Sequence, residues 1–172
     1  DVMGATGVVE APAYAERIPE IDSYTRYAYA SVVAKLGDEW VRQYNTLFSD
    51  PGTFDIFDYQ VLSGTLEGAL DELNQVVILR SVAEKYFNRV DVAGQEMQMK
   101  LEGKVETYIV TAVYEDFPEN SSLDTEMYFS WHKYKTFYKT PNNAWSNLGI
   151  TSIIMLKEIP TQIEPLEAKL RE

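Results

Sequence analysis

The single histidine, His132, is the residue through which any histidine-based proton relay in this chain would have to act. It lies in an aromatic and basic stretch, residues 131–139, and no acidic residue stands beside it to orient its imidazole. A Ser-His-Asp relay needs that acidic partner, so the sequence favours a surface histidine over a catalytic one. The chain contains no cysteine, which excludes thiol nucleophiles, thiolate metal sites and disulfides.

Carboxylates are abundant, with 27 acidic side chains in 172 residues. Neighbouring pairs of them could act as a general acid and base or hold a hard cation. The pairs are Asp55 with Asp58, Asp71 with Glu72, and Glu115 with Asp116. None belongs to a calcium-loop or zinc-protease motif, so they are interpreted as solvated surface charges. The glycines at 4 and 7 also lack the Gly-Lys-Ser/Thr of a phosphate loop, and the sequence therefore predicts no catalytic residue, metal or cofactor.

The most unusual stretch is residues 131–139 (WHKYKTFYK), where aromatic rings alternate with lysines in an otherwise acidic chain. Rings beside cations are typical of residues that anchor protein interfaces. The alternative is an amphipathic element whose rings pack inward while its lysines stay in water. The candidates for docking a partner are Trp131, Lys133, Tyr134, Lys135 and Tyr138.

Composition and charge limit the class of protein. Hydrophobic residues make up 45% and charged residues 24% of the chain, as in folded globular proteins. The formal charge of −12 argues against binding to nucleic acid or anionic lipid. The longest aliphatic runs, residues 76–79 and 153–156, fall far short of the roughly 18 apolar residues of a membrane helix. With no signal segment at Asp1 and a charged helical pattern at the other end, we expect a soluble piece of a longer protein.

Alternating apolar positions predict two antiparallel hairpins. The first joins residues 23–33 and 40–48 through Gly37-Asp38, and the second joins residues 97–101 and 105–113 at Gly103. Further strands are predicted at 76–79, as a buried β-branched run, and at 151–157.

Helices are expected between these strands, without the regular alternation of a doubly wound sheet. They lie at residues 13–18, weakly at 66–73, after a Ser81/Glu84 capping box, and after a Thr161/Glu164 capping box. The aromatic stretch at 128–138 is ambiguous between helix and strand. The prediction is an α+β fold.

Five sequence blocks in the middle of the chain resemble, in order and spacing, the MacB-like periplasmic core domains of FtsX-like ABC transporter permeases. They are residues 54–64 (FDIFDYQVLSG), 76–87 (VVILRSVAEKYF), 92–95 (VAGQ), 108–113 (YIVTAV) and 116–121 (DFPENS). The last is similar to a D-x-P-x-N-S segment of Bacteroidetes-type members. Ala93 and Ala112 depart from residues that are usual in the family, but the family has no catalytic signature that these changes would affect.

The resemblance implies a two-lobed extracytoplasmic domain with mixed and antiparallel sheets. Residues 1–53 and 124–172 would build a porter-like lobe, and residues 54–123 a small α/β-rich Sabre-like lobe. It also implies insertion between two membrane helices of an inner-membrane permease, with the domain in the periplasm.

The function that the resemblance implies is mechanical and not enzymatic. ATP hydrolysis by a cytoplasmic ATPase subunit or domain would move the permease helices and, through them, this domain. The implied partners are that ATPase, a second permease copy and a periplasmic adaptor or carrier protein.

Two other classes of function stay open. A free-standing periplasmic ligand-binding protein or lipoprotein would lack the membrane helices that the permease interpretation requires. A small hydrolase would need a pocket around His132 with an acidic partner.

Overall fold

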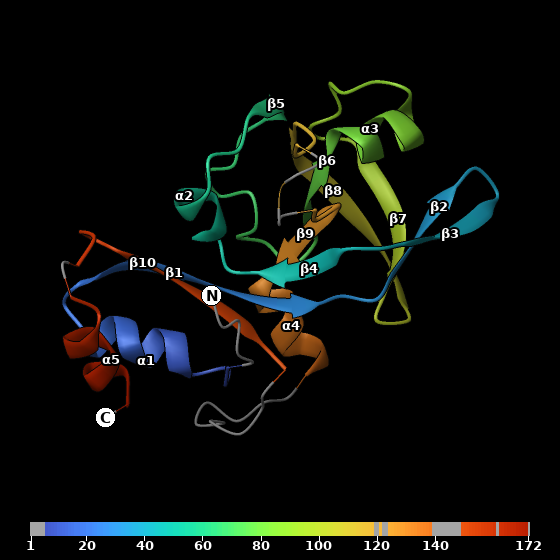
Figure 1. The fold of residues 1–172 in the computed structure, drawn as a ribbon. Coiled ribbons are helices and arrows are strands. Elements are labelled where there is room, and N and C mark those ends of the chain that lie inside the picture. The colour runs from blue at the N-terminus through green and yellow to red at the C-terminus, as the bar shows by residue number, and fades with distance from the viewer. Residues whose placement is uncertain (1–5, 119–120, 122–123, 139–148, 161, 172) are drawn as a thin grey trace.

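The computed structural model describes residues 6–118, 121, 124–138, 149–160 and 162–171 (Figure 1). The helices are α1 (Glu10–Arg17), α2 (Thr53–Ile56), α3 (Arg80–Phe87), α4 (Trp131–Phe137) and α5 (Glu164–Arg171). The strands are β1 (Ile21–Tyr29), β2 (Val32–Leu36), β3 (Glu39–Gln43), β4 (Thr46–Ser49), β5 (Val61–Gly64), β6 (Gln75–Leu79), β7 (Glu96–Leu101), β8 (Lys104–Tyr114), β9 (Met127–Ser130) and β10 (Thr151–Leu156).

All strands of the described residues belong to one sheet in the order β10-β1-β4-β9-β6-β8-β7-β2-β3, and β5 pairs with β8 beside that path. The β4–β9 and β6–β8 pairs are parallel and the others antiparallel. This confirms the predicted α+β class with a mixed sheet. Figure 1 shows α1 and α5 beside β1 and β10 at one end of the molecule, and the β2–β3 hairpin at the other.

The centre of the sheet is the buried strand that the sequence predicts at 76–79. Val76, Val77 and Ile78 of β6 are fully buried. Neighbouring β8 and β9 cover both edges of β6, so its backbone groups are paired on both sides. An apolar β-branched run suits such a strand because neither face meets water.

Tyrosines fill much of the core on one side of this centre. Tyr59 lies in edge-to-face contact with Tyr114 and Tyr128, at ring-centroid distances of 5.2 and 6.1 Å. The hydroxyls of Tyr59 and Tyr128 are 3.0 Å apart, and the Tyr114 hydroxyl donates to the carbonyl of Thr125. Each buried phenol therefore has a polar partner, and burial raises the pKa of Tyr59 and Tyr114.

The first predicted hairpin is shorter than the sequence suggested. Gly37-Asp38 does form its turn, but only β2 and β3 pair across it. Residues 23–29 belong to a separate strand, β1, and residues 46–49 form β4, which pairs with β1 and, in parallel, with β9. The break falls at Asn45, whose φ of 49° ends β3 and redirects the chain. The alternation of side chains along the sequence cannot reveal such a break, because the alternating pattern continues across the break. The second predicted hairpin, β7–β8, is confirmed.

Two helix predictions are wrong in detail. The weak helix at 66–73 is a series of turns, in which Gly68 adopts a φ of 69° that no helix contains. The Ser81/Glu84 capping box does not form, because α3 begins one residue earlier, at Arg80, and Leu79 is its N-cap. The backbone N–H of Ser81 donates instead to Asp116, 3.0 Å away in the loop after β8. A carboxylate far off in sequence thus replaces the expected local cap.

Other expectations have mixed outcomes. The ambiguous stretch 128–138 divides into β9 and α4, and α1, β10 and α5 occur close to where helices and a strand were expected. Thr161 of the second capping box lies outside the described residues.

The strand ladders link segments that the sequence assigned to different lobes. Within the described residues, β2 pairs with β7, and β4 joins β6 through β9. The division into two lobes, residues 1–53 with 124–172 and residues 54–123, therefore stays a prediction. The hydrogen-bonded sheet continues across the boundary between these two sets of residues.

Candidate functional site

Four of the candidate docking residues lie on α4, directly after the buried strand β9, and the fifth, Tyr138, is the C-cap of this helix. Ser130 ends the strand, and its hydroxyl accepts a hydrogen bond from the backbone N–H of His132 at 3.2 Å. This serine cap starts the helix at Trp131 and so fixes which side chains of the next turns face inward.

Three aromatic rings form a column: those of Trp131 and Tyr134 in α4 and that of Tyr138, which follows the helix directly. Trp131 stacks on Tyr134 with centroids 4.6 Å apart, and Tyr134 stacks on Tyr138 at 4.7 Å. The guanidinium of Arg26 closes the inner end of the column, 4.4 Å from the centroid of Trp131. Trp131 and Tyr134 are buried, whereas Tyr138, the outer member, is 39% exposed.

Lys133 is buried and paired, contrary to the expectation that the lysines of this stretch stay in water. Its ammonium group forms an ion pair with Glu106 on β8, and Glu106 also accepts from Lys104 at 2.7 Å and from the Tyr108 hydroxyl at 2.9 Å. Burial alone would raise the pKa of Glu106, but hydrogen bonds from Lys104, Lys133 and Tyr108 outweigh it and lower the pKa to about 2. Glu106 therefore keeps its negative charge at neutral pH.

Of the five candidate docking residues, only Lys135 and Tyr138 are exposed. Trp131, Lys133 and Tyr134 belong to the interior of the fold. The residues that suggested docking are thus divided between the packed and the solvated sides of one segment. Docking through Lys135 and Tyr138 stays a prediction.

Tyr138 lies on a groove of about 340 Å³ at the base of the β2–β3 hairpin. Its hydroxyl donates to Glu102 at 2.7 Å, and burial together with this carboxylate raises the pKa of Tyr138 to about 12. Tyr29 and Tyr44 line the same groove and are 81% and 66% exposed. The sequence analysis did not identify either tyrosine as a candidate. The feature that could have indicated them is their position beside Ala30-Ser31 and Asn45, where the strands are interrupted.

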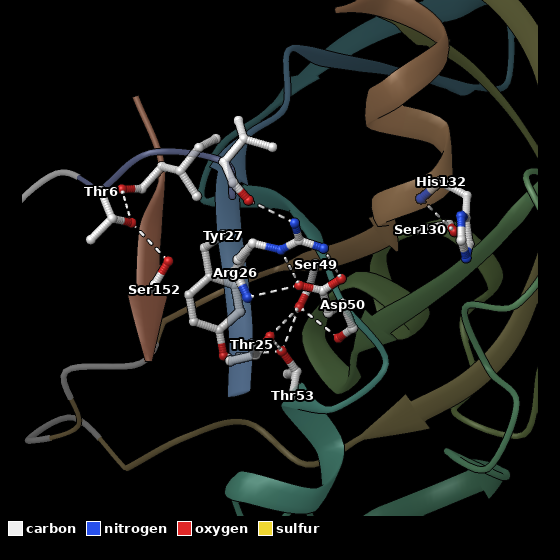
Figure 2. Close-up of polar contacts among 12 residues, drawn as sticks. Thr6, Thr25, Arg26, Tyr27, Ser49, Asp50, Thr53, Ser130, His132 and Ser152 are labelled. Atoms are coloured by element: carbon white, nitrogen blue, oxygen red, sulfur yellow. Dashed lines mark hydrogen bonds and ion pairs between the residues drawn. The ribbon is translucent and has the colours of Figure 1, made fainter. Parts of the chain in front are cut away.

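A second polar cluster lies between β1, β4 and α2, and all its hydroxyls are buried (Figure 2). The hydroxyl of Thr25 is 2.6 Å from that of Thr53 and 3.3 Å from that of Ser49. Thr53 in turn donates to the Tyr27 hydroxyl at 3.2 Å. Its members bond to one another, and no imidazole or carboxylate acts as a base for Ser49 among the described residues. The cluster is a structural network.

Beside the cluster, Arg26 and Asp50 form a bidentate ion pair, with N–O distances of 2.7 and 2.8 Å. Asp50 also accepts the backbone N–H of Arg26 at 3.1 Å, and Arg26 donates to the carbonyl of Val8 at 2.8 Å. The pair therefore joins the segment before α1 to β1 and to the end of β4. Bidentate geometry with little solvent around it makes this a strong structural clamp.

The structure places the other sequence candidates on the surface and apart. His132 is exposed, and in Figure 2 no interaction connects its ring to the hydroxyl cluster. Glu115 binds Arg80 at 3.1 Å, which lowers the pKa of Glu115, and Asp116 caps α3. The remaining carboxylate pairs, at 55 with 58 and 71 with 72, are exposed. No group of three or more potential metal ligands occurs among the described residues.

No helix in the described part of the chain is long and apolar enough to cross a membrane. Two large apolar side chains stand out at the end of the molecule that carries α5: Ile159 is 95% exposed and Ile163 is 59% exposed.

Residues 4–172 match the MacB-like periplasmic core domain family, and the chain belongs to this family. The family is a periplasmic domain of ABC transporter permeases, which work with an ATPase, and it is generally non-catalytic. No curated protein matches the chain in sequence.

Three solved structures share the fold. A domain of a protein described as a permease from Porphyromonas gingivalis has a TM-score of 0.74 and 24% identity, over 99% of this chain and 71% of its own. The periplasmic region of MacB from Actinobacillus actinomycetemcomitans has a TM-score of 0.69 and 16% identity, over 98% and 72%. The extracellular domain of the ABC-type transporter YknZ from Gram-positive bacteria has a TM-score of 0.61 and 17% identity, over 98% and 80%. At these identities the likeness concerns the fold alone.

Proposed function

We propose that this chain is the extracytoplasmic, non-catalytic domain of an ABC transporter permease and that it acts as a stiff body that transmits motion. ATP hydrolysis by a cytoplasmic ATPase moves the membrane helices of the permease, and this domain carries the movement to the far end of its sheet. There it acts against a second permease copy and a periplasmic adaptor or carrier protein.

The observation that carries this proposal is the unbroken path of strand pairs through the molecule. From β10 at one end, each strand is hydrogen-bonded to the next as far as β3 in the distal hairpin. A force applied at β1 or β10 is therefore passed on by backbone hydrogen bonds and not by loops. Packed interiors transmit strain in this way because they are nearly incompressible.

The first and last described segments of the chain are attached to the same edge of this sheet, which β1 and β10 form. The backbone N–H of Thr6 donates to Ile150 at 2.7 Å, and the Thr6 hydroxyl lies 2.7 Å from that of Ser152 in β10. On the other side, Lys169 of α5 forms an ion pair with Glu20, and Arg17 of α1 donates to the carbonyl of Lys169 at 3.0 Å. This arrangement supports insertion between two membrane helices, because both would then act on the β1–β10 edge of the sheet.

The polar clusters also support a structural role. The buried hydroxyls around Thr53 bond to each other, the Arg26–Asp50 pair binds three segments together, and His132 is exposed. These groups hold elements in place and leave no reactive group aimed at a pocket among the described residues. Lys135 and Tyr138 are the members of the docking set that a partner protein could reach.

The proposal is tested in membranes that contain the full-length permease and its ATPase. Glu72→Cys, at an exposed turn, introduces one spin-label site in this domain, which has no cysteine of its own; any cysteine elsewhere in the permease is first replaced by serine. Pulsed EPR should show that the distance between labels on two copies differs between the nucleotide-free and ATP-bound states. An identical distance distribution in every nucleotide state would count against mechanical transmission.

A matched variant checks that the shift depends on the connection between the sheet and the chain end. Three glycines inserted after Glu158, between β10 and α5, should reduce the nucleotide-dependent shift, because only the N-terminal attachment at Thr6 and the contacts of α5 with Glu20 and Arg17 then remain. The unfolding temperature of the domain should stay close to that of the parent, because Glu158 is exposed and outside the core. A full shift in this variant would show that motion does not enter through the C-terminal connection.

A further inference from the structure

Strand β3 is the last strand of the sheet, and among the described residues no strand pairs with its outer edge. Figure 1 shows the β2–β3 hairpin projecting from the molecule on the side away from α1 and α5. Proteins usually protect such an edge with proline, lysine or a bulge. Residues 39–43 contain neither proline nor lysine, and their register with β2 is continuous. The outer backbone groups of β3 are therefore open to another strand.

The geometry of the hairpin determines which backbone groups point outward. Leu36 and Glu39 flank the two-residue turn, in which Gly37 has a φ of 59°. Residues that flank such a turn exchange both hydrogen bonds, and the bonded pairs then recur at every second position. Residues 39, 41 and 43 thus bond to β2, whereas the N–H and C=O groups of Trp40 and Arg42 point outward.

The side chains of the same two residues lie on the solvent face of the hairpin. Trp40 is opposite Lys35 of β2, and Arg42 is opposite Val33. Lys100 of β7 belongs to the same face, because it pairs with Val33 from the other side. None of these side chains is buried, whereas the alternate residues of β2 and β7 belong to the core: Val32, Ala34, Met99 and Leu101.

This face carries a local excess of positive charge. The Lys100 ammonium lies 4.2 Å from the ring centroid of Trp40. None of Lys35, Arg42 and Lys100 takes part in an ion pair of the described residues. The positions of β2 and β3 on this face hold no carboxylate, although the whole chain has a net charge of −12. The charge that complements this face is therefore that of carboxylates.

We propose that the β3 edge binds an extended, acidic segment of a partner protein, which joins the sheet as a further strand. Main-chain hydrogen bonds to Trp40 and Arg42 hold such a segment, and its alternate side chains give specificity. On the solvent face its carboxylates lie beside the Arg42 guanidinium. Lys35 lies two strand spacings, about 10 Å, from the new strand, a distance that lysine and glutamate side chains span together.

The other face of the edge takes a different kind of side chain. Val41 is half-buried there, and Glu39 adds a negative charge beside it. Residues of the partner strand that point to this face are therefore apolar and not acidic. The expected segment alternates acidic and apolar residues, because successive residues of a strand point to opposite faces.

The surroundings favour a different protein as the occupant. Tyr44 follows β3 directly, its ring lies 5.9 Å from the Arg42 guanidinium, and exposed Tyr29 lines the same groove. Tyrosine, tryptophan and arginine are the residues most enriched at protein interfaces. An anionic membrane would repel a chain of this net charge. A second copy does not suit the edge, since a two-fold axis at Trp40 would gather the cations of both copies.

The inference adds the chemistry of a partner to the proposed function and rests on it only for the presence of a partner at this end of the sheet. The binding itself is measured on the 172-residue chain alone, without the transporter. The acidity of the chain makes an acidic probe selective, because the rest of the surface repels it.

The probe is a fluorescent peptide of about eight residues, the length of an ordinary strand, in which glutamate and valine alternate. Fluorescence anisotropy measures its binding at chain concentrations up to about 1 mM. The peptide should bind, and one of the same composition with all its glutamates in one half should bind at least about tenfold more weakly. A version with N-methylated backbone amides should not bind, because it cannot donate hydrogen bonds to β3.

Variants of the chain locate the binding site. Arg42→Glu should weaken binding of the alternating peptide at least about tenfold, and Lys35→Glu should weaken it less. The matched control is Arg17→Glu, which makes the same change in net charge at an exposed position of α1, at the other end of the molecule (Figure 1). It should bind like the unaltered chain, and all variants should keep the circular dichroism spectrum of that chain.

No binding at the highest concentration would overturn the proposal, and so would equal losses in Arg42→Glu and Arg17→Glu. Undiminished binding of the N-methylated peptide would exclude strand addition and overturn it as well. Binding to phosphatidylglycerol vesicles that Arg42→Glu abolishes would assign the cations to a lipid surface, and self-association that it abolishes would assign the edge to a second copy; either result overturns the proposal. None of these results affects the distance measurement in the full-length permease, so the two proposals fail separately.

Discussion

Lys133 and Glu106 show how a single side chain can be misjudged from its sequence surroundings. Lys133 stands among residues that suggested a docking patch, but it is buried beneath α4 and bonded to Glu106 on β8. The ring centroids of Tyr108 and Phe137 each lie 5.6 Å from its ammonium group. A buried charge of this kind is tolerated only with its partner in place.

The first prediction concerns the loss of that partner. Glu106→Gln should lower the free energy of unfolding by about 2–4 kcal/mol, because it leaves the Lys133 charge without its counter-ion. The double variant Glu106→Gln with Lys133→Met should recover much of the loss. Chemical denaturation of the three variants measures both effects, and equal stability of the single and double variants would contradict the account.

A second prediction follows from the pKa of Glu106, which is lowered to about 2 in the folded state from its ordinary value of 4.5. Because the folded pKa lies below the unfolded one, the group stabilises the fold above about pH 4.5, and this contribution is lost as the pH falls toward 2. The stability difference between the parent and Glu106→Gln should therefore shrink over this range. Denaturation curves at a series of pH values measure it, and a constant difference would contradict the assignment.

At the scale of elements, the attachment of β5 to β8 depends on one glycine. Gly64 has a φ of 77°, and a Cβ at this position would lie 2.1 Å from the carbonyl oxygen of Thr111 and 2.9 Å from the Cβ of Ala93. The Thr111 carbonyl cannot move freely, because Thr111 belongs to strand β8, which is paired on both sides. The close approach of the two backbones is possible only without a side chain.

The third prediction separates this clash from backbone strain. Gly94 has a similar φ of 86° but open space around a Cβ. Gly94→Ala should cost about 1–2 kcal/mol from the left-handed conformation alone, whereas Gly64→Ala should cost at least about 2 kcal/mol more. Thermal or chemical unfolding of the two variants gives the comparison. Equal losses would mean that β5 moves away from β8 without cost.

Much of the element order was predictable, because it depends on local patterns. The apolar run of β6, the β7–β8 hairpin around Gly103 and the Gly37-Asp38 turn all follow from residue type and period. The ends of β1, β3 and β4 do not follow from these patterns, since the break between β3 and β4 depends on the conformation of Asn45. The cap of α3 could not be predicted from the sequence either, because only the parallel pairing of β6 and β8 brings Asp116 close to Ser81.

The same distinction applies to the candidate site. The sequence drew attention to the right segment, residues 131–138, but not to its orientation. Which rings of α4 face inward depends on Ser130 as its cap and on Arg26, more than a hundred positions earlier, at the end of the aromatic column. The groove beside Tyr138 joins residues of β1, β3 and the β7–β8 turn, so no local pattern could have indicated it.

At the scale of the whole molecule, the central feature is one sheet that reaches from the β1–β10 edge, where Thr6 and α5 are attached, to the distal hairpin. This continuity predicts that the domain moves as one body. A fold with two independently moving lobes would instead change shape internally when the transporter binds ATP.

The most direct measurement of this claim is the distance between two labels within one copy of the domain in the full-length transporter. Glu72→Cys and Glu158→Cys place labels at two exposed positions, one beyond the centre of the sheet and one after β10. Mixing a small share of doubly labelled copies with unlabelled ones isolates the distance within a copy. That distance should be the same with and without ATP, while the Glu72 labels on two different copies change their separation. A change within the copy that follows the nucleotide state would contradict a stiff transmitting domain.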